Sequence, residues 1–424
     1  MCSRDWDREA VTMASVYGSA AITICAEAAA NSQCGIFKSA NKRRGFEVRL
    51  PANSPQNSFE YDIYLRARTQ GIRGDFHIGD RAWVLQESLL SPRVIIYTAG
   101  QVKWSCRTAE KSEAGPLGED NYLLGVVRFG TYQKSLLFPT TGSDFGDGKL
   151  TGSLTLTRIE KMPFKPKDYS DYASQHRELL SCWYQIVEYY GPCDLTKAKD
   201  RLPAIAGVAK RLSALTGYTY LAGLWLEDIV RGLCWSPHGQ PRTSSEYVGP
   251  TWSWVSLKYY PRDKLLSLYY LPIHEDFKVA EDIKIEDINI KYATADEFMQ
   301  VQEGSSLRIR GLCCGIGYTV ENLVSNNFDG WKWDTYMSGK KQFSFLASAL
   351  DNQGSPVDRK LSFLHLGQTQ DDLVSPPAKI YLLVLERSPG DSGSYVRTGF
   401  VTVPMKTWEQ VDLEFWSVQS FTFI

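Results

Sequence analysis

The stretch Asp5–Ala26, DWDREAVTMASVYGSAAITICA, sets the fold class of the amino-terminal part of the chain. Its first half places four apolar side chains on one helix face, and these are Trp6, Ala10, Met13 and Tyr17. Three carboxylates, Asp5, Asp7 and Glu9, lie in or near the first turn, where they favour the positive end of the helix dipole. Gly18 is expected to end the helix, and residues 21–26 then have the pattern of a short buried strand. A helix followed by a strand predicts an α/β fragment.

A second ordered block has the sequence RAWVLQESLLSPRVIIYTAGQVKWSC and covers residues 81–106. Residues 81–90 are helical in pattern, and Ser91-Pro92 stops the helix because proline disfavours helix in the residue before it. Two strand-like runs, 94–97 and 102–106, follow on either side of Gly100. This arrangement predicts a β-hairpin.

The remaining chain divides by composition into an irregular stretch and a longer ordered part. Residues 107–170 are rich in Gly, Pro, Ser and charge, which predicts an insertion or linker with one short strand at 154–158. Helical patterns follow at 172–190 and at about 203–215, and strand-like runs dominate from residue 247. We therefore expect an α+β protein with three parts: 1–106, 107–170 and 171–424. The last part is helical over 171–235 and β-rich over 247–424.

The overall composition is that of an ordinary globular protein. The 424 residues suggest two or three folding units, and 43% are hydrophobic while 22% are charged. Lys and Arg number 47 against 48 for Asp and Glu, a formal net charge of −1. Nucleic-acid-binding proteins usually carry a basic excess, so we expect no nucleic-acid partner. The one basic cluster, Lys42-Arg43-Arg44, is too short to change this expectation.

Targeting signals and cysteine usage favour a reduced, cytoplasmic environment. No apolar run reaches the roughly 20 residues that span a bilayer, and the amino terminus MCSRDWDRE is charged throughout. The nine cysteines are odd in number, are irregularly spaced and include no CxxC pair. Cys313 and Cys314 are adjacent in a strand-like run and point to opposite faces, so they make a poor metal pair. We expect no membrane span and no metal site.

Enzyme motifs are largely missing. The chain has no glycine-rich phosphate loop, no GxGxxG after a strand and no HExxH. Its five histidines lack metal-ligand spacing, and His176 lies on the apolar face of its helix, where a core role is favoured. The string Gly390-Asp391-Ser392-Gly393 resembles a protease nucleophile loop, but it follows Ser388-Pro389 between two strand-like runs. It is therefore interpreted as a turn.

Other candidate residues each have a structural and a functional interpretation. Asp5, Asp7 and Glu9 could provide a general base or a ribose contact, but spacing alone favours charges that complement the helix dipole. Glu87 could be catalytic, although a solvated helix face is the default. Trp252 and Trp254 lie two apart and would share one face of a strand. Without interleaved basic residues, a core or interface wedge is favoured over an aromatic binding platform.

Taken together, these blocks resemble the fungal heterokaryon incompatibility (HET) domain family. The likeness covers the two amino-terminal blocks quoted above and GIF at 35–37. Three later stretches, DRLPAIAGVAKRL, YLAGLWLEDIVRGLCW and PTWSWVSL, resemble the segment that usually follows this domain, and YLLVLERSPGDSGSYVRTGFVTV at 381–403 is a weaker match. Family members also carry strands before the DWxRE helix that this sequence lacks. The resemblance therefore implies that the amino-terminal part of the domain is missing here.

The resemblance implies a protein of non-self recognition and regulated cell death, whose partners are allelic or non-allelic incompatibility proteins. The family's domain has been likened to the Toll/interleukin-receptor (TIR) fold, so the first part is expected to be a truncated, TIR-like α/β fragment. Because some TIR proteins cleave NAD, the analogy would make Glu9 the catalytic glutamate and NAD the only cofactor. The empty motif search favours a non-catalytic protein.

Two further points stay open. An accessory role in a fungal secondary-metabolite gene cluster is an alternative to incompatibility, although no residue indicates a substrate. The oligomeric state is not indicated by the sequence either.

Overall fold

The computed structural model describes most of the chain, in several segments. These are residues 3–29, 31–36, 45–50, 61–66, 81–98, 101–112, 115–116, 134, 136–137, 169–238, 242–243, 246–258, 267–270, 277–314, 318–319, 326–328, 331–338, 341–348, 360–369, 378–391, 393–405 and 416–424. The chain forms two compact units, Met1–Pro166 and Lys167–Ile424, which we call unit 1 and unit 2 and describe separately. Both helices and sheets are present, so the coarse α+β class is confirmed.

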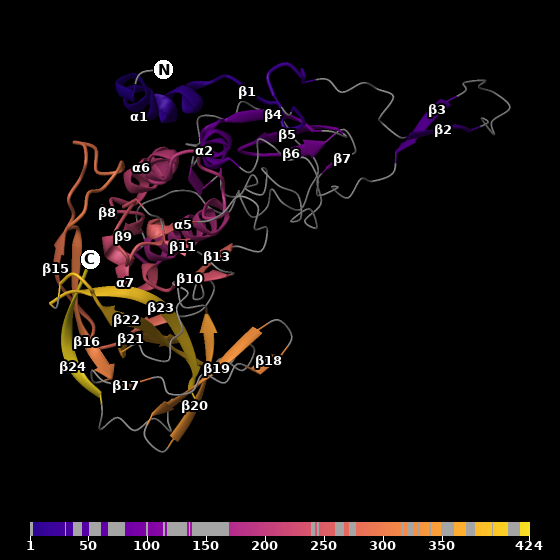
Figure 1. The fold of residues 1–424 in the computed structure, drawn as a ribbon. Coiled ribbons are helices and arrows are strands. Elements are labelled where there is room, and N and C mark those ends of the chain that lie inside the picture. Colours follow the sequence, from indigo (N-terminus) through magenta and orange to yellow (C-terminus); the bar gives the residue numbers. More distant parts are fainter. Residues whose placement is uncertain are drawn as a thin grey trace. The chain divides into compact units, whose positions relative to one another are not determined.

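Unit 1 begins with the predicted helix and strand (Figure 1). Helix α1, Ser3–Ser19, runs one residue past Gly18, so that glycine does not end the helix. Strand β1, Thr23–Cys25, follows, but Ile24 is 59% exposed, and the expectation of a buried strand is wrong. The reason is that β1 has one face turned to solvent.

The second block folds as predicted. Helix α2, Ala82–Leu90, precedes strand β4, Arg93–Tyr97, which forms an antiparallel hairpin with β5, Val102–Cys106. Strand β1 lies parallel to β4. Each of these two neighbouring strands is preceded in the chain by a helix, β1 by α1 and β4 by α2. Two short strands, β6 (Glu110–Ser112) and β7 (Gly115–Pro116), extend the sheet in the order β1-β4-β5-β6-β7.

The sheet of unit 1 has two chemically different faces. Val94, Ile96, Lys103 and Ser105 share the buried face, which we call the inner face. The opposite, outer face carries a cross-strand row in which Ile24 registers with Ile95, Ile95 with Trp104, and Trp104 with Lys111. Ile95 and Trp104 are only half-buried.

Two other parts of unit 1 complete the description. Strands β2 (Gly45–Leu50) and β3 (Tyr61–Arg66) form a separate antiparallel hairpin. Beyond β6 and β7, most of the predicted insertion 107–170 lies outside the described residues, as do the expected strand at 154–158 and the basic cluster at 42–44.

The first half of unit 2 is helical, as predicted. Helix α5, Tyr169–Tyr190, ends where the Gly191 N–H donates to the Val187 carbonyl at 2.8 Å. Helix α6, Ala206–Thr216, ends at Gly217, whose φ of 74° makes it a left-handed cap. A short helix α7 (Ile229–Gly232) and four 3₁₀ turns complete this half: η3 (Ala198–Asp200), η4 (Pro203–Ile205), η5 (Leu226–Asp228) and η6 (Trp254–Ser256).

A tight hairpin lies within this helical half. Strands β8 (Tyr220–Leu221) and β9 (Leu224–Trp225) are joined by Ala222 and Gly223, which have φ of 48° and 97°. Two positive φ values in succession are typical of the turns that connect hairpin strands. The Gly223 carbonyl accepts indole N–H groups from Trp183 at 3.3 Å and from Trp254 at 3.0 Å.

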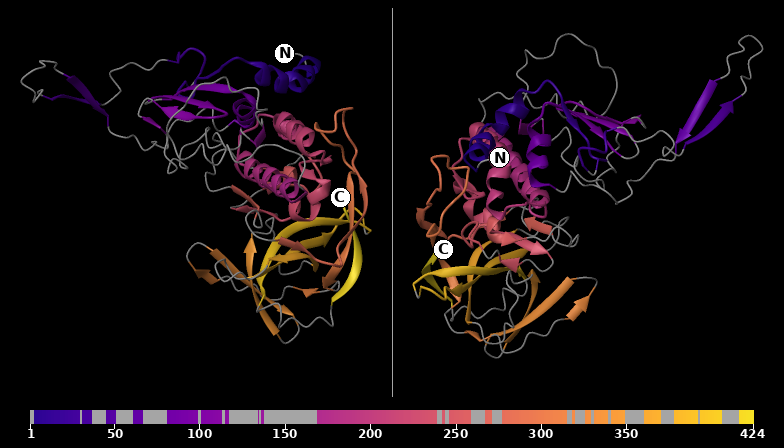
Figure 2. Two further views of the ribbon diagram at one scale, coloured as in Figure 1. Left: turned by 180° about the vertical axis from the view of Figure 1, so that it is seen from behind. Right: turned by 45° about the horizontal axis from the view of Figure 1, so that its top comes forward.

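The second half of unit 2 is one large sheet, curved around itself at one end of the unit (Figures 1 and 2). Five strands pair in a closed cycle: β16 (Ser306–Cys314), β21 (Lys360–Thr369), β22 (Lys379–Arg387), β23 (Tyr395–Pro404) and β24 (Trp416–Phe423). The six other strands of the sheet are β14 (Phe277–Val279), β15 (Lys284–Asn289), β17 (Tyr318–Thr319), β18 (Asn326–Phe328), β19 (Trp331–Ser338) and β20 (Lys341–Ser348).

Four small strands connect the two halves of unit 2 in antiparallel pairs. Strand β10 (Trp235–His238) pairs with β13 (Ser267–Tyr270), and β11 (Arg242–Thr243) pairs with β12 (Leu257–Lys258). The Arg397 guanidinium of β23 lies 3.2 Å above the ring centre of Trp235 and donates to the Trp235 carbonyl. The Arg397 N–H donates to the Thr251 hydroxyl at 3.2 Å. These contacts attach the closed strand cycle to the helical half.

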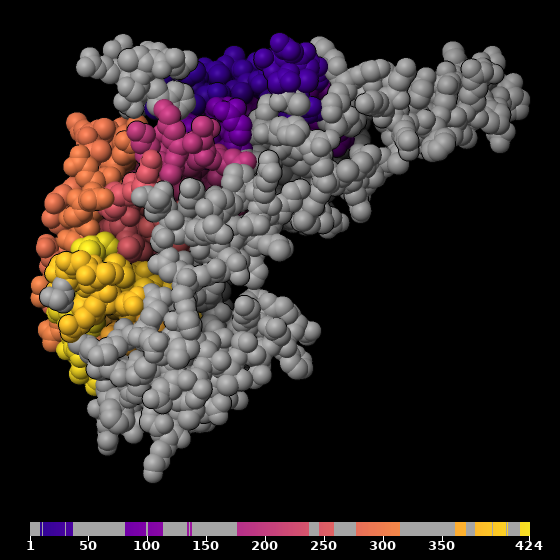
Figure 3. Space-filling model, viewed as in Figure 1, coloured from indigo at the N-terminus to yellow at the C-terminus, as the bar shows by residue number. Residues whose placement is uncertain are grey.

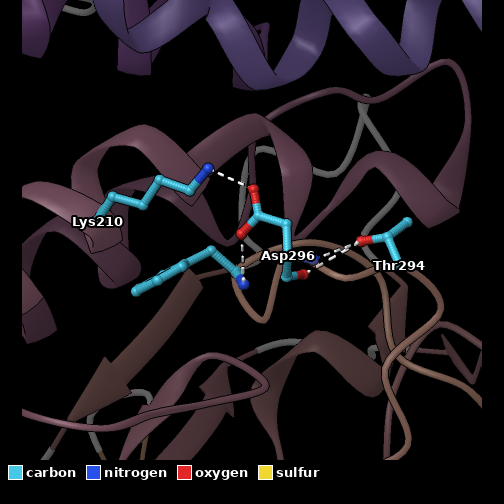
Figure 4. Close-up of polar contacts among 4 residues, drawn as sticks. Lys210, Thr294 and Asp296 are labelled. Carbon is cyan, nitrogen blue, oxygen red and sulfur yellow. Dashed lines mark hydrogen bonds and ion pairs between the residues drawn. The ribbon is translucent and has the colours of Figure 1, made fainter.

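A polar contact also fastens the β15–β16 connection to α6 (Figure 4). The Lys210 ammonium forms an ion pair with Asp296 and lies 5.8 Å from the ring centre of Phe298. Asp296 Oδ1 accepts the Phe298 N–H at 3.2 Å, and the Thr294 hydroxyl donates to the Asp296 carbonyl. Phe298 in turn stacks on Tyr220, with ring centres 5.1 Å apart.

The helices of the described residues can be compared with the requirements of a bilayer span. None of their helices combines the length and the apolar character that a membrane span requires.

Candidate functional site

Four ionisable side chains lie together in unit 1 and form the strongest candidate site. We call Glu27, Lys103, Glu110 and Lys134 the ionisable cluster. Glu27 follows the carboxyl end of β1 and is 2% exposed, Lys103 on β5 is 8% exposed, and Lys134 is 1% exposed. Charged side chains are almost never buried to this degree unless they have partners. Their burial therefore needs an electrostatic explanation.

Opposite charges alternate through the cluster. Burial raises the pKa of Glu27, and the nearby Lys103 opposes this rise. Burial also raises the pKa of Glu110, against the charges of Lys134 and Lys103 and a 3.3 Å hydrogen bond from the Ser105 hydroxyl. Desolvation lowers the pKa of Lys134 to about 8, partly offset by Glu110 and Cys106. In each case the cost of burial exceeds the attraction of the partners.

A third carboxylate, Glu87, lies near the cluster, since it and Glu27 both act on Cys25. Burial raises the pKa of Glu87 on α2, although Arg81 and a hydrogen bond with Tyr17 of α1 oppose the shift. The same hydrogen bond and burial raise the pKa of Tyr17 above its ordinary value. Burial raises the pKa of Cys25 on β1 to about 12, and Glu27 and Glu87 add to the rise. Glu87 is half-buried and forms a hydrogen bond with Tyr17, so it does not lie on a freely solvated helix face as the default interpretation had it.

The cluster has the chemistry of proton transfer. Carboxyl groups with raised pKa values and an amine with a pKa of about 8 all exchange protons closer to neutral pH than free Glu or Lys does. Within the described residues, Glu27 Oε2 and Lys134 Nζ have no hydrogen-bond partner. Buried polar atoms without partners are costly, so these two atoms add to the electrostatic strain of the cluster.

The residue named by the TIR analogy is in a different environment. Glu9 lies on α1 and is exposed, and the Thr12 hydroxyl donates to its backbone carbonyl at 2.9 Å. The segment from α1 to the residues after β1 forms part of the molecular surface (Figure 3). The side chains of Asp5 and Asp7 lie outside the described residues. Glu9 therefore does not share the burial of the ionisable cluster.

Sequence reasoning missed most of the cluster. Glu27 was visible as a single acid inside the apolar run 20–30, and Lys103 as a single base inside a strand-like run. A lone charge in an otherwise buried run is the available signal for such sites. Lys134 gave no such signal, because it lies in the irregular insertion 107–170 rather than in an apolar run.

The other candidates have structural roles in unit 2. The four tryptophans that the sequence places between residues 225 and 254 are completely buried, and these are Trp225, Trp235, Trp252 and Trp254. The core interpretation of the tryptophans is therefore confirmed, but Trp254 begins the 3₁₀ turn η6 after the cap Ser253, so the pair does not lie on a strand. His176 is 7% exposed, and its Nδ1 lies 2.9 Å from the Tyr218 hydroxyl, as expected for a satisfied core histidine.

Two motif interpretations can also be checked. Asp391 and Gly393 lie between β22 and β23, and the Gly393 N–H donates to Asp391 Oδ1 at 2.9 Å, which is the geometry of a turn. In the parts of the chain that the structure describes, no group of three or more His, Cys, Asp or Glu side chains is arranged to hold a metal ion. Cys313 is completely buried.

Comparison with known proteins leaves the family unassigned. Neither a protein-family model, nor a curated protein, nor a solved structure matches the chain. The likeness to the HET family therefore depends on the stretches quoted from the sequence.

Proposed function

We propose that the protein is a HET-like signalling protein of fungal non-self recognition, which engages an incompatibility protein and promotes regulated cell death without catalysis of its own. Two lines of evidence support the proposal. The stretches that resemble the family supply α1, β1, α2, β4 and β5, which form one continuous part of unit 1. The outer face of the same sheet has the character of a protein-binding surface.

The row of exposed and half-buried apolar side chains on the outer face is the single observation that supports the interaction role. Ile22, just before the edge strand β1, is 42% exposed, and Ile24 on β1 is 59% exposed. The cross-strand row continues from Ile24 through half-buried Ile95 and Trp104. A contiguous apolar surface of this kind marks interaction sites more often than scattered apolar residues do. Aromatic residues such as Trp104 are also enriched in the cores of protein interfaces.

A growth assay in a fungal host tests this role. The full chain is expressed alone and together with candidate allelic partners, and growth arrest or cell death is expected in at least one pairing. Ile24→Lys places a charge on the outer face and should abolish the arrest. Val16→Lys is the matched control, because Val16 on α1 is also 59% exposed. Absence of arrest in every pairing would refute the incompatibility role, and unchanged arrest with Ile24→Lys would refute the role of the outer face.

One observation favours a catalytic alternative, NAD cleavage by a TIR-like domain. Glu27 follows the carboxyl end of a strand in a parallel pair, which is where open α/β sheets bind ligands, and its raised pKa suits a general acid. Under this alternative Glu27 is a better candidate than Glu9. Purified protein is incubated with NAD, and nicotinamide release is compared with that of Glu27→Gln and Glu9→Ala. Background release by the unmodified protein would exclude the alternative.

A further inference from the structure

The outer face of the unit 1 sheet carries charge of one sign. Two charged side chains lie on it: Lys111 of β6, which registers with Trp104, and Arg93 of β4, which precedes Ile95 by two residues. Both cations are exposed. The acid of the same strands, Glu110, registers with a residue of the inner face instead. In the described strands of this sheet, the outer face therefore has cations and no carboxylate.

The two cations are not neutralised by neighbouring side chains. The Arg93 guanidinium donates to the Ala21 carbonyl at 3.5 Å, a contact with a neutral group. Within the part of the chain that the structure describes, no carboxylate forms an ion pair with Arg93 or Lys111. The buried lysines of the ionisable cluster differ, since each of them acts on a glutamate. An anionic partner would supply the carboxylates that the outer face lacks.

A hollow with apolar walls lies on the same face. Its volume is about 280 Å³, and its lining includes Ile95, Val102 and Trp104 together with Lys111. Lys111 thus borders the hollow, while Arg93 lies two residues from Ile95 on β4. An apolar pocket with charged groups around it is the usual arrangement for an anchoring side chain at a protein interface. The hollow therefore favours a partner that presents one large apolar side chain.

The spacing of the two cations favours an extended ligand. Arg93 and Lys111 are offset by two residues along the strands, about 7 Å, and by two strands across the sheet, about 10 Å. Their Cα atoms are therefore about 12 Å apart. Residues i and i+4 of an extended chain are about 13 Å apart, and residue i+2 between them lies on the same face. Two acids at i and i+4 would thus match the two cations, with an apolar residue at i+2.

We propose that the outer face binds an extended segment of the partner protein with the pattern acidic–x–apolar–x–acidic. The apolar side chain enters the hollow against Ile95 and Trp104, and the two carboxylates pair with Arg93 and Lys111. This inference rests on the proposed function, because it names the chemistry of the partner that the outer face engages. The cations select acidic segments, and the hollow provides the apolar contact.

Binding of a synthetic peptide tests the class of partner. The full chain is immobilised on a sensor surface, and the peptide Gly-Glu-Ser-Phe-Ser-Glu-Gly is injected at up to millimolar concentration. Saturable binding is expected, and it should weaken several-fold when NaCl is added, because both cations are exposed. The peptide Gly-Glu-Phe-Ser-Ser-Glu-Gly has the same composition but places Phe on the opposite face from the acids, so it should bind more weakly. Equal binding of the two peptides, or binding of neither, would overturn the proposal.

Charge reversal identifies the binding face. Arg93→Glu and Lys111→Glu should each weaken binding about fivefold. The double variant should bind the peptide Gly-Lys-Ser-Phe-Ser-Lys-Gly, which the unmodified chain should not bind. Lys197→Glu is the matched control, since Lys197 is an exposed cation of unit 2, and it should leave binding unchanged. All three positions are exposed, so the variants should fold, and failure of the double variant to bind the lysine peptide would refute the proposed ion pairs.

Anionic lipid is the other partner that combines negative charge with apolar groups. Vesicles of equal parts phosphatidylcholine and phosphatidylserine are sedimented with the full chain, and the chain is expected to stay in the supernatant. Sedimentation with the vesicles that is lost in Arg93→Glu would overturn the assignment to a protein segment.

The peptide assay and the growth assay separate two kinds of failure. If Ile24→Lys abolishes growth arrest but the charge reversals do not exchange peptide preference, the partner chemistry is wrong and the proposed function stands. If the peptides bind as expected but no pairing arrests growth, the incompatibility role is wrong and the acidic–apolar specificity of the outer face stands.

Discussion

Replacement of Gly223 by alanine should severely destabilise unit 2. Gly223 has a φ of 97°, a region that residues with a Cβ atom rarely adopt. An added Cβ would lie 2.9 Å from Trp254 Nε1 and 3.0 Å from Cε2 of the same ring. The ring cannot move freely, because its N–H donates to the carbonyl of Gly223 itself. The substitution therefore combines backbone strain with overpacking.

The two costs can be estimated separately. Backbone strain in the left-handed region costs on the order of 1–2 kcal/mol. Overpacking a well-filled core adds about 1–3 kcal/mol. Gly217 supplies the control, since its φ is 74° but nothing lies within 4 Å of an added Cβ. Gly217→Ala should thus be destabilised by the strain alone, about 1–2 kcal/mol, while Gly223→Ala should be destabilised by about 2–5 kcal/mol.

Urea unfolding followed by tryptophan fluorescence measures both variants. The signal is suitable because Trp183 and Trp254 contact Gly223 directly. The midpoint for Gly223→Ala should fall well below that for Gly217→Ala, with an unchanged dependence on urea. Equal midpoints for the two variants would refute the reasoning, because they would show that the Trp254 ring gives way at no cost.

Two further predictions concern electrostatics. A carboxyl group with a folded-state pKa above its unfolded value stabilises the fold below the unfolded pKa, and this contribution is lost as pH rises through the folded pKa. Glu87→Gln should accordingly stabilise unit 1 more at pH 7 than at pH 4.5, measured by hydrogen exchange of peptides from 93–106; a larger gain at pH 4.5 would contradict this sign. The Lys210–Asp296 pair is partly exposed, with 31% and 22% of the two side chains accessible, so a double-mutant cycle to alanine should give a coupling of about 0.5–1 kcal/mol. That coupling should weaken in 1 M salt, and an unchanged value would argue against an ion pair.

Local patterns in the sequence predicted much of the fold because the relevant interactions are local. Helices α1, α2 and α5 follow from apolar spacing, and Ser91-Pro92 correctly marked the end of α2. Strand β22 was also visible as an apolar run, since it is buried over most of its length. Each of these elements is determined by residues within a few positions of one another.

The site could not be predicted in the same way, because its properties arise between distant segments. Glu87 looks like a solvated helix residue until Tyr17 and Cys25 are placed beside it. The same limit explains the error for Trp252 and Trp254. Their spacing fits a strand, but the Ser253 hydroxyl accepts the Val255 N–H and begins a 3₁₀ turn instead.

The closed strand cycle also has a consequence for how unit 2 is made in the cell. The contact between Trp235 and Arg397 cannot form until Arg397, which follows Trp235 by 162 residues, has been synthesised. At a synthesis rate of about 5–20 residues per second, this delay is on the order of 10–30 s. Over the later part of that interval β16 has been made but its partner β24 has not, so the backbone donors and acceptors of β16 that face β24 stay unpaired. The yield of folded protein should therefore depend on the speed of translation through residues 314–416 and on chaperones that bind the unpaired strand β16.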